Sequence, residues 1–216
     1  MPTAYAREQM IEQQVRAWDV LDERVLEIFR KVPREHFVPS EHRYLAFADL
    51  EIPLPQGQHM LRPSVAGRLL QALELTGKQR VLQIGAGSGF LTACLANAAA
   101  HVESIEIFAE LAGLAHANLA SLSVGNVHIV TADAMQLDSR TRYDAIAVTG
   151  SMPLQDERFQ RQLQIGGRLF MVIGEAPVMA AQLVRRTAEA TWTFESLFET
   201  VIDPLVNARK PAEFTF

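Results

Sequence analysis

One segment, Arg80 to Phe90 (RVLQIGAGSGF), constrains the fold of this chain more than any other. It has the pattern of a buried strand, a turn with glycines at 85, 87 and 89, and the start of a helix. A second apolar run ends at Glu106, which follows Gly85 by 21 residues. Nucleotide-binding α/β folds use this spacing, because glycines let the backbone approach the ligand and a carboxylate accepts both hydrogens of a ribose diol. The segment therefore predicts a site for a nucleoside-bearing cofactor.

The glycine pattern narrows the choice of cofactor. A nicotinamide fingerprint requires glycine at the position of Phe90, and the Gly-Lys-Ser/Thr of a phosphate-binding loop does not occur in the sequence. The G-x-G-x-G pattern resembles the first motif of Rossmann-like methyltransferases that use S-adenosylmethionine (SAM). The alternative is a tight turn without a ligand, which we disfavour because three alternating glycines cost chain entropy.

From residue 78 onward, short apolar runs alternate with helical patterns. The alternation predicts an α/β fold with a Rossmann-like, doubly wound and mostly parallel sheet, closed by an antiparallel pair at 182–187 and 191–202. Ligands bind beyond the carboxyl ends of such strands, so the glycine turn, Glu106, Asp133 and Thr149 should meet there. The expected strands are 81–84, 101–105, 127–131, 145–149 and 169–173, with helices at 91–98, 109–119 and 156–163.

Residues 1–77 are expected to form a helical extension in front of a cofactor-binding domain at 78–216, together making one compact unit. Helices are predicted at 4–18 and 22–31, the second capped by Asp22 and stopped by Pro33, and a third is predicted from Ser64 to Gly77. Between them, residues 49–63 are a proline-rich stretch without regular pattern, and long loops of this kind are often functional.

Composition excludes several classes of protein. The net charge of −5 and pI near 5.7 argue against a nucleic-acid partner, which a basic face would accompany. No run approaches the 18 apolar residues of a membrane span, and residues 1–14 lack a signal-peptide apolar region, so we expect a cytoplasmic protein. The single cysteine, Cys94, lies in an apolar segment and is interpreted as a core residue rather than a nucleophile.

Further segments resemble one methyltransferase family. They are Lys31 to Pro39 (KVPREHFVP), Ile52-Pro53 through Gly57-Gln58, Pro63, Asp144 to Thr149, Gln162 to Leu169 and Pro204-Leu205. In this order, across residues 8 to 206, they resemble protein-L-isoaspartate O-methyltransferases. Members of that family use SAM to methylate the abnormal carboxylate of an isoaspartyl residue, which allows its return to aspartate. The resemblance therefore implies SAM as cofactor, S-adenosyl-L-homocysteine as by-product and a damaged protein or peptide as partner.

The resemblance also implies which residues hold the cofactor. The glycine turn would bind the methionine end of SAM, Glu106 the ribose, and Asp133 would lie beside the adenine. Asp133-Ala134-Met135-Gln136 equally fits a helix capping box in which Gln136 reaches back. The full predicted set is Gln83, Gly85, Ala86, Gly87, Ser88, Gly89, Glu106, Ile107, Asp133, Ala134 and Thr149.

The chain departs from the family in its acceptor loop. The family typically has Gly-Gln-Thr-Ile-Ser-Gln-Pro, whereas this chain has GQHMLRP at 57–63, so Leu61 stands where the family has its active-site serine. Leucine forms no hydrogen bond to a carboxylate. Arg62 could instead bind a carboxylate with its planar fork, and His59 could deprotonate a neutral acceptor. The predicted catalytic positions are therefore His59, Leu61 and Arg62.

Three functions remain open from the sequence. The leading prediction is a SAM-dependent O-methyltransferase acting on isoaspartyl carboxylates. A second is a paralogue that methylates another acceptor, including a small molecule, with His59 as base. A third is a SAM-binding protein without turnover. The histidines show no metal-ligand spacing, so no metal is predicted, and the oligomeric state stays open.

Overall fold

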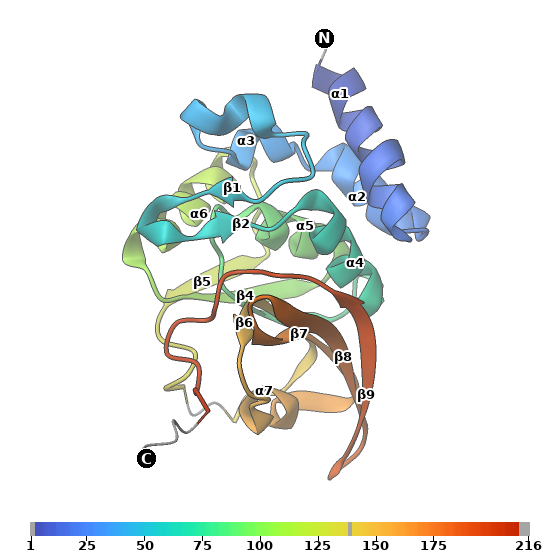
Figure 1. The fold of residues 1–216 in the computed structure, drawn as a ribbon, viewed down its shortest axis with the longest axis vertical. Helices are drawn as coiled ribbons and strands as arrows, with labels where there is room; N and C mark the ends of the chain where they lie inside the picture. Colours follow the sequence, from blue (N-terminus) through green and yellow to red (C-terminus); the bar gives the residue numbers. More distant parts are fainter. Residues whose placement is uncertain (1–2, 138–139, 212–216) are drawn as a thin grey trace.

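A seven-stranded sheet forms the centre of the computed structural model, which describes residues 3–137 and 140–211 (Figure 1). Its strand order is β5-β4-β3-β6-β7-β8-β9. The first five strands in this order pair in parallel, whereas β8 pairs antiparallel with both β7 and β9. The predicted fold class is confirmed. The strands are β3 (Arg80–Ile84), β4 (His101–Glu106), β5 (Val127–Thr131), β6 (Tyr143–Met152), β7 (Leu163–Glu175), β8 (Val178–Ala188) and β9 (Thr191–Glu199).

Both faces of the sheet are buried, which explains why its central strands lack a polar alternation. Along β3, Val81 packs into one apolar cluster and Leu82 into another, because successive side chains point to opposite faces. The same division separates Ala145 from Ile146 on β6. The helices that follow residue 62 are α4 (Pro63–Leu73), α5 (Phe90–Ala98), α6 (Ala109–Ser121) and α7 (Glu157–Arg161).

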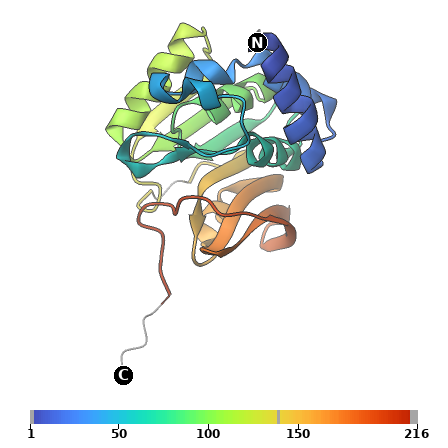
Figure 2. The same ribbon diagram turned by 45° about the horizontal axis from the view of Figure 1, so that its top comes forward.

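The N-terminal residues form a layer over one side of the sheet (Figure 2). Its regular elements are α1 (Thr3–Met10), α2 (Glu23–Lys31), α3 (Arg34–Phe37), β1 (Ile52–Pro53) and β2 (His59–Met60). The helix predicted at 4–18 continues from α1 through a π turn and a 3₁₀ turn to Trp18. One apolar cluster contains residues from this layer and from the sheet, so the two parts predicted on either side of residue 77 share a core. The predicted outer limits, residues 1 and 216, lie outside the described residues.

Two local predictions differ from the structure. The stretch 49–63 is not wholly irregular, because β1 and β2 pair antiparallel around a short 3₁₀ turn. Ser64 does not cap α4, which begins at Pro63 and ends at Leu73, where Glu74 follows in a left-handed conformation, before the predicted end at Gly77. The reason is that the Ser64 amide and hydroxyl both donate to Asp49, at 2.9 and 2.8 Å, which ties the helix start to the preceding loop. By contrast, Asp22 caps α2 as predicted, accepting a hydrogen bond from the Arg24 amide.

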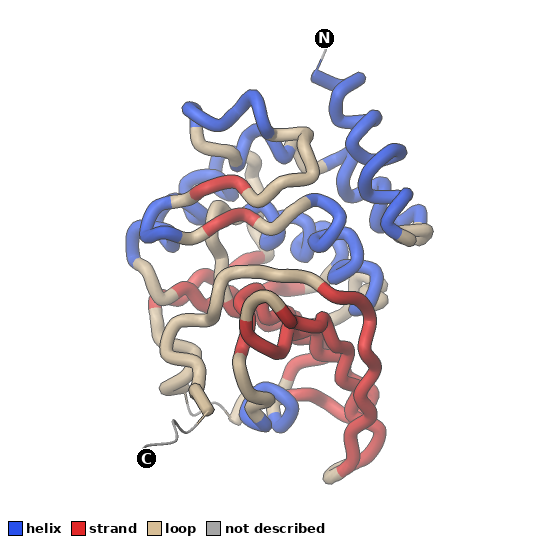
Figure 3. The backbone as a smooth tube through the Cα atoms, in the orientation of Figure 1, coloured by secondary structure: helices blue, strands red, loops and turns tan. Residues whose placement is uncertain are grey.

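After β9, residues 200–208 run as a loop between β2 and the carboxyl ends of the central strands (Figures 1 and 3). The backbone of Ser151, near the end of β6, holds this segment. Its amide donates to the Asp203 carbonyl, and its carbonyl accepts from the Leu205 amide, each at 2.8 Å. The segment therefore closes the edge of the sheet at which a ligand of such a fold would bind. No helix among the described residues has both the length and the apolar character needed to cross a bilayer.

Candidate functional site

The glycine turn after β3 has a backbone that side chains would disrupt. Gly85 has φ of 90°, and a Cβ built there would lie 2.3 Å from the Oγ1 atom of Thr149. Thr149 is held in place by donating to the carbonyls of Ile84 and Gly85, at 2.8 and 3.2 Å. Gly87 also has a positive φ, of 54°. Glycine is required here both for conformation and for close approach of backbone to whatever the turn contacts.

Glu106 lies at the end of β4 beside this turn, with its side chain buried and its carboxylate fixed by backbone. Oε2 accepts from the Gly87 amide at 2.9 Å, and Oε1 accepts from the Phe108 amide at 3.1 Å. A carboxylate has about four lone-pair sites, so both oxygens keep acceptor capacity for a diol. The predicted pairing of glycine turn and acid is therefore present as direct contact.

Gln83 shows that the site has an unsatisfied acceptor. Its side chain is only 1% exposed, and its Nε2 donates to the Gly85 carbonyl at 2.7 Å. Its Oε1 is buried and has no hydrogen-bond partner. An unpaired buried acceptor is costly, and a cationic donor such as the ammonium of a bound methionine moiety would satisfy it. The residues at this end of the site thus fit a methionine-bearing cofactor.

Asp133 forms a turn rather than the helical capping box that its sequence also allowed. Oδ1 accepts from the Met135 amide at 2.8 Å, as a cap would. The side-chain amide of Gln136, however, donates to Oδ2 of the same side chain at 2.8 Å instead of reaching the backbone, and residues 134–136 form a turn. Asn207 adds a second bond to Oδ2 at 2.9 Å, which ties this corner to the C-terminal segment.

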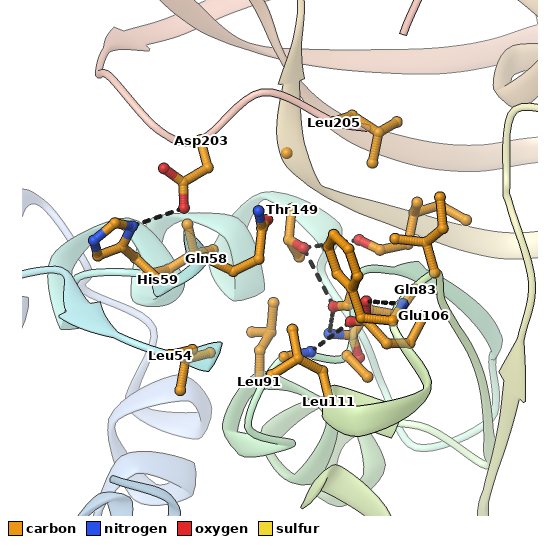
Figure 4. Close-up of a pocket in the computed structure, with 18 of the residues that line it drawn as sticks. Leu54, Gln58, His59, Gln83, Leu91, Glu106, Leu111, Thr149, Asp203 and Leu205 are labelled. Carbon is orange, nitrogen blue, oxygen red and sulfur yellow. Dashed lines mark hydrogen bonds and ion pairs between the residues drawn. The ribbon is translucent and has the colours of Figure 1, made fainter. Parts of the chain in front are cut away.

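Most of the predicted site residues line one pocket (Figure 4). Gly89 and Arg62 are outside its lining. Gly89 packs on α6, where an added Cβ would lie 3.1 Å from Ala115 Cα. Arg62 donates to Thr200 Oγ1 at 3.1 Å. The predicted residues that the pocket brings together are His59, Leu61, Gln83, Gly85, Ala86, Gly87, Ser88, Glu106, Ile107, Asp133, Ala134 and Thr149.

The end of the pocket opposite Glu106 is formed by the β1–β2 hairpin and the C-terminal segment. There the Nδ1 atom of His59 lies 2.9 Å from Oδ2 of Asp203. Glu51 also lines this end, and burial raises the pKa of its carboxyl, although the nearby Arg62 acts in the opposite direction. Sequence reasoning missed Glu51 and Asp203 as site residues. The only available signal for Asp203 was its position immediately before the Pro204-Leu205 pair.

A buried arginine, Arg34, binds the backbone of the acceptor loop at residues 57–63. Arg34 donates from Nη2 to the Leu61 carbonyl at 3.0 Å and from Nε to the Ala46 carbonyl at 3.1 Å. Its guanidinium lies 4.8 Å from the ring centroid of Phe90, the first residue of α5. Burial lowers the pKa of Arg34 to about 10. Arg34 thus connects the acceptor loop to the helix that follows the glycine turn.

Cys94 is fully buried, and burial raises the pKa of its thiol, which disfavours the nucleophilic thiolate. Its interpretation as a core residue agrees with this environment. Among residues 3–137 and 140–211, no group of three or more His, Cys, Asp or Glu side chains is arranged to hold a metal ion.

Comparison with known proteins assigns the family. The model of the protein-L-isoaspartate(D-aspartate) O-methyltransferase (PCMT) family matches residues 5–210. The chain belongs to this family. A protein-L-isoaspartate O-methyltransferase from Rhodopseudomonas palustris (strain ATCC BAA-98 / CGA009) is 41% identical over 202 residues, which cover 92% of each protein. A relative from Geotalea uraniireducens, protein-L-isoaspartate O-methyltransferase 1, is 35% identical over 94% of this chain and 93% of its own length.

Solved structures agree with the fold. The crystal structure of a PCMT from Plasmodium falciparum, described as a complex with S-adenosyl-L-homocysteine, superposes with a TM-score of 0.78 at 19% identity, covering 92% of this chain and 97% of that one. Membership of the PCMT family makes the chain a SAM-dependent methyltransferase, which confirms the predicted family, enzyme class and cofactor.

Proposed function

We propose that this PCMT-family chain transfers the methyl group of SAM to the carboxylate of an L-isoaspartyl residue in a protein or peptide. The observation that carries the proposal is a single pocket lined both by the glycine turn and by the acceptor loop at His59 and Leu61. Relatives that match more than nine-tenths of the chain bear the name of this activity, which supports the same acceptor.

We assign the cofactor contacts from the fixed groups around the turn. Gln83 would accept from the methionine ammonium, since its Oε1 is the unpaired acceptor. Glu106 would accept from the ribose hydroxyls, and Asp133 would mark the adenine end. The backbone of Gly85, Ala86, Gly87 and Ser88, together with Ile107, Ala134 and Thr149, would complete the contacts, while Gly89 packs the turn on α6.

Methyl transfer to a carboxylate requires the protein mainly to position the two reactants. SAM supplies a methyl group bonded to a positively charged sulfur. A carboxylate oxygen forms the new bond to that methyl carbon while the carbon–sulfur electron pair moves to sulfur, leaving a neutral thioether and a methyl ester. The nucleophile is already ionised, so no general base is required. Alignment of the two partners and exclusion of water then account for the catalysis, and positioning of this sort lowers barriers by about 7–11 kcal/mol.

One observation favours a second candidate, methylation of a neutral acceptor. The His59–Asp203 contact has the geometry of an imidazole oriented by a carboxylate, an arrangement that suits a general base. In that case His59 would remove a proton from a phenol, hydroxyl or amine before methyl transfer.

Incubation with methyl-labelled SAM tests these candidates. An isoaspartyl peptide and its normal aspartyl twin are compared under identical conditions. Label on the isoaspartyl peptide alone, as a base-labile ester, supports the proposal. Transfer to a lysate component that gives a base-stable product supports the second candidate, and saturable SAM binding without transfer to either peptide or to any lysate component refutes both. The Gly87→Val variant is the control for the cofactor site, because a side chain at φ of 54° is strained and a Cβ there would lie 3.4 Å from Leu54. It should lose cofactor binding.

A further inference from the structure

The acceptor end of the pocket contains a pair of side chains from segments far apart in sequence. His59 lies on β2, and Asp203 lies on the C-terminal segment that crosses the sheet edge. Their Nδ1 and Oδ2 atoms are 2.9 Å apart, and the side chains are 36% and 29% exposed. Figure 4 shows the pair facing each other at the side of the pocket away from Gln83 and Glu106.

This contact determines which ring atom of His59 is available to a ligand. A carboxylate only accepts, so Asp203 must receive the Nδ1 hydrogen. Nε2 is then the remaining polar atom of the ring, and within the described residues it has no protein partner. Because Nδ1 already gives its hydrogen to Asp203, Nε2 can donate to a second carboxylate only when the ring carries both hydrogens.

Other polar groups nearby are less suited to bind an acceptor carboxylate. The Leu61 side chain forms no hydrogen bond, and Arg62 lies outside the pocket lining, with its Nη2 atom donating to Thr200. Gln58 lines the pocket and can donate, but its side chain is neutral. Charges facing His59 come from Glu51, Arg62 and Asp203, which sum to −1 when all are ionised. An arriving carboxylate would be repelled by this set unless the imidazole ring is positively charged.

We infer that His59, oriented by Asp203, binds the carboxylate of the methyl acceptor through Nε2–H, so that the ring donates to one carboxylate from each nitrogen. In this chain it takes over the substrate contact that a hydroxyl at the Leu61 position would make. The inference rests on the proposed function for the identity of the acceptor. It makes His59 a substrate-binding residue and Asp203 a positioning residue that acts through it.

Peptide binding, measured without turnover, tests this role. The full-length protein is loaded with S-adenosyl-L-homocysteine, and a fluorescent isoaspartyl peptide is titrated by anisotropy from about pH 5 to 8, the range over which imidazoles change charge. For the wild type, affinity should fall as pH rises, because the donor on Nε2 is lost. The His59→Gln variant should bind about 10- to 100-fold more weakly at the acidic end, the range expected for one charge-assisted hydrogen bond, and its affinity should change little with pH.

Matched variants separate the pair from its surroundings. Asp203→Asn is isosteric and should weaken binding in the same direction, whereas adding it to His59→Gln should cause little further loss, since one acts through the other. Glu51→Gln removes the other carboxyl that titrates nearby and should leave the pH dependence in place. His116→Gln, on the exposed side of α6, is the control and should match the wild type. Calorimetric binding of S-adenosyl-L-homocysteine should persist in every variant, which shows that each one is folded.

Three results would overturn the inference: wild-type affinity that rises with pH, a His59→Gln variant that binds like the wild type, or no binding of the isoaspartyl peptide to the wild type. The proposed function fails separately, if the peptide binds with the expected pH dependence but receives no label from SAM.

Discussion

The glycine turn makes a quantitative prediction for Gly85→Ala. The added methyl must adopt φ near 90°, and a non-glycine residue in so sparsely populated a region costs about 1–3 kcal/mol. It would also meet Thr149 Oγ1 at 2.3 Å, so Thr149 must move and give up the hydrogen bond that its hydroxyl shares between two carbonyls, worth about 1 kcal/mol. We therefore expect a loss of about 2–4 kcal/mol in the free energy of unfolding. For a chain of this size that corresponds to a melting temperature lower by about 4–16 °C.

The assay is urea unfolding followed by circular dichroism, with Gly113→Ala as the matched control. Gly113 lies on the exposed side of α6, where an added Cβ meets nothing within 4 Å. There the same substitution should stabilise by about 0.5–1 kcal/mol, through the higher helix propensity of alanine. Adding Thr149→Ala to Gly85→Ala removes the clash but not the backbone strain, so it should recover only part of the loss. If Gly85→Ala unfolds within 0.5 kcal/mol of the wild type, roughly the limit of such comparisons, the reasoning is wrong.

Three further predictions concern titrating groups. Burial raises the pKa of the Glu51 carboxyl in the folded protein above its unfolded value of about 4. The free energy of unfolding should therefore fall as pH rises from the unfolded to the folded pKa of this group. Unfolding curves measured over a pH series should show that Glu51→Gln removes this loss. Asp156 has a lowered pKa: burial raises it, but bonds from the Arg158 amide and guanidinium outweigh burial. This contribution is present above the unfolded pKa and lost as pH falls through the folded one. Asp156→Ala should therefore cost about 0.5–2 kcal/mol at neutral pH and progressively less in acid. Cys94 should react with a thiol reagent only as fast as the protein unfolds, and rapid labelling of the native protein would contradict its burial.

The sheet and the cofactor side of the pocket could be predicted because their signals are local. β3, the glycine turn and α5 are consecutive in sequence, and each has a composition with few structural alternatives. Parallel pairing then places Glu106 beside Gly87 without any knowledge of side-chain contacts. By contrast, Ser64 was predicted to cap the helix that follows it, but a tertiary contact prevents this. The Ser64 amide and hydroxyl both donate to the carboxylate of Asp49.

The acceptor side could not be predicted in the same way, because its key contacts join distant parts of the chain. His59 and Asp203 are separated by 144 residues, and Arg62 and Thr200 by 138. Neither pair has a sequence pattern that links its members. Arg62 was therefore predicted to bind a carboxylate with its planar fork, whereas in the structure its Nη2 atom donates to Thr200.

The C-terminal segment contacts both ends of the pocket. Asn207 binds Asp133 at the proposed adenine end, and Asp203 binds His59 at the acceptor end, while Ser151 fixes the backbone between them. A segment held at three points adjusts as a unit, so a cofactor that orders Asp133 would also restrict the position of Asp203. Binding of S-adenosyl-L-homocysteine should therefore strengthen peptide binding, and the Asn207→Ala variant should show a smaller increase, because one of the three contacts is missing. Equal peptide affinity with and without the by-product would show that the segment does not couple the two ends.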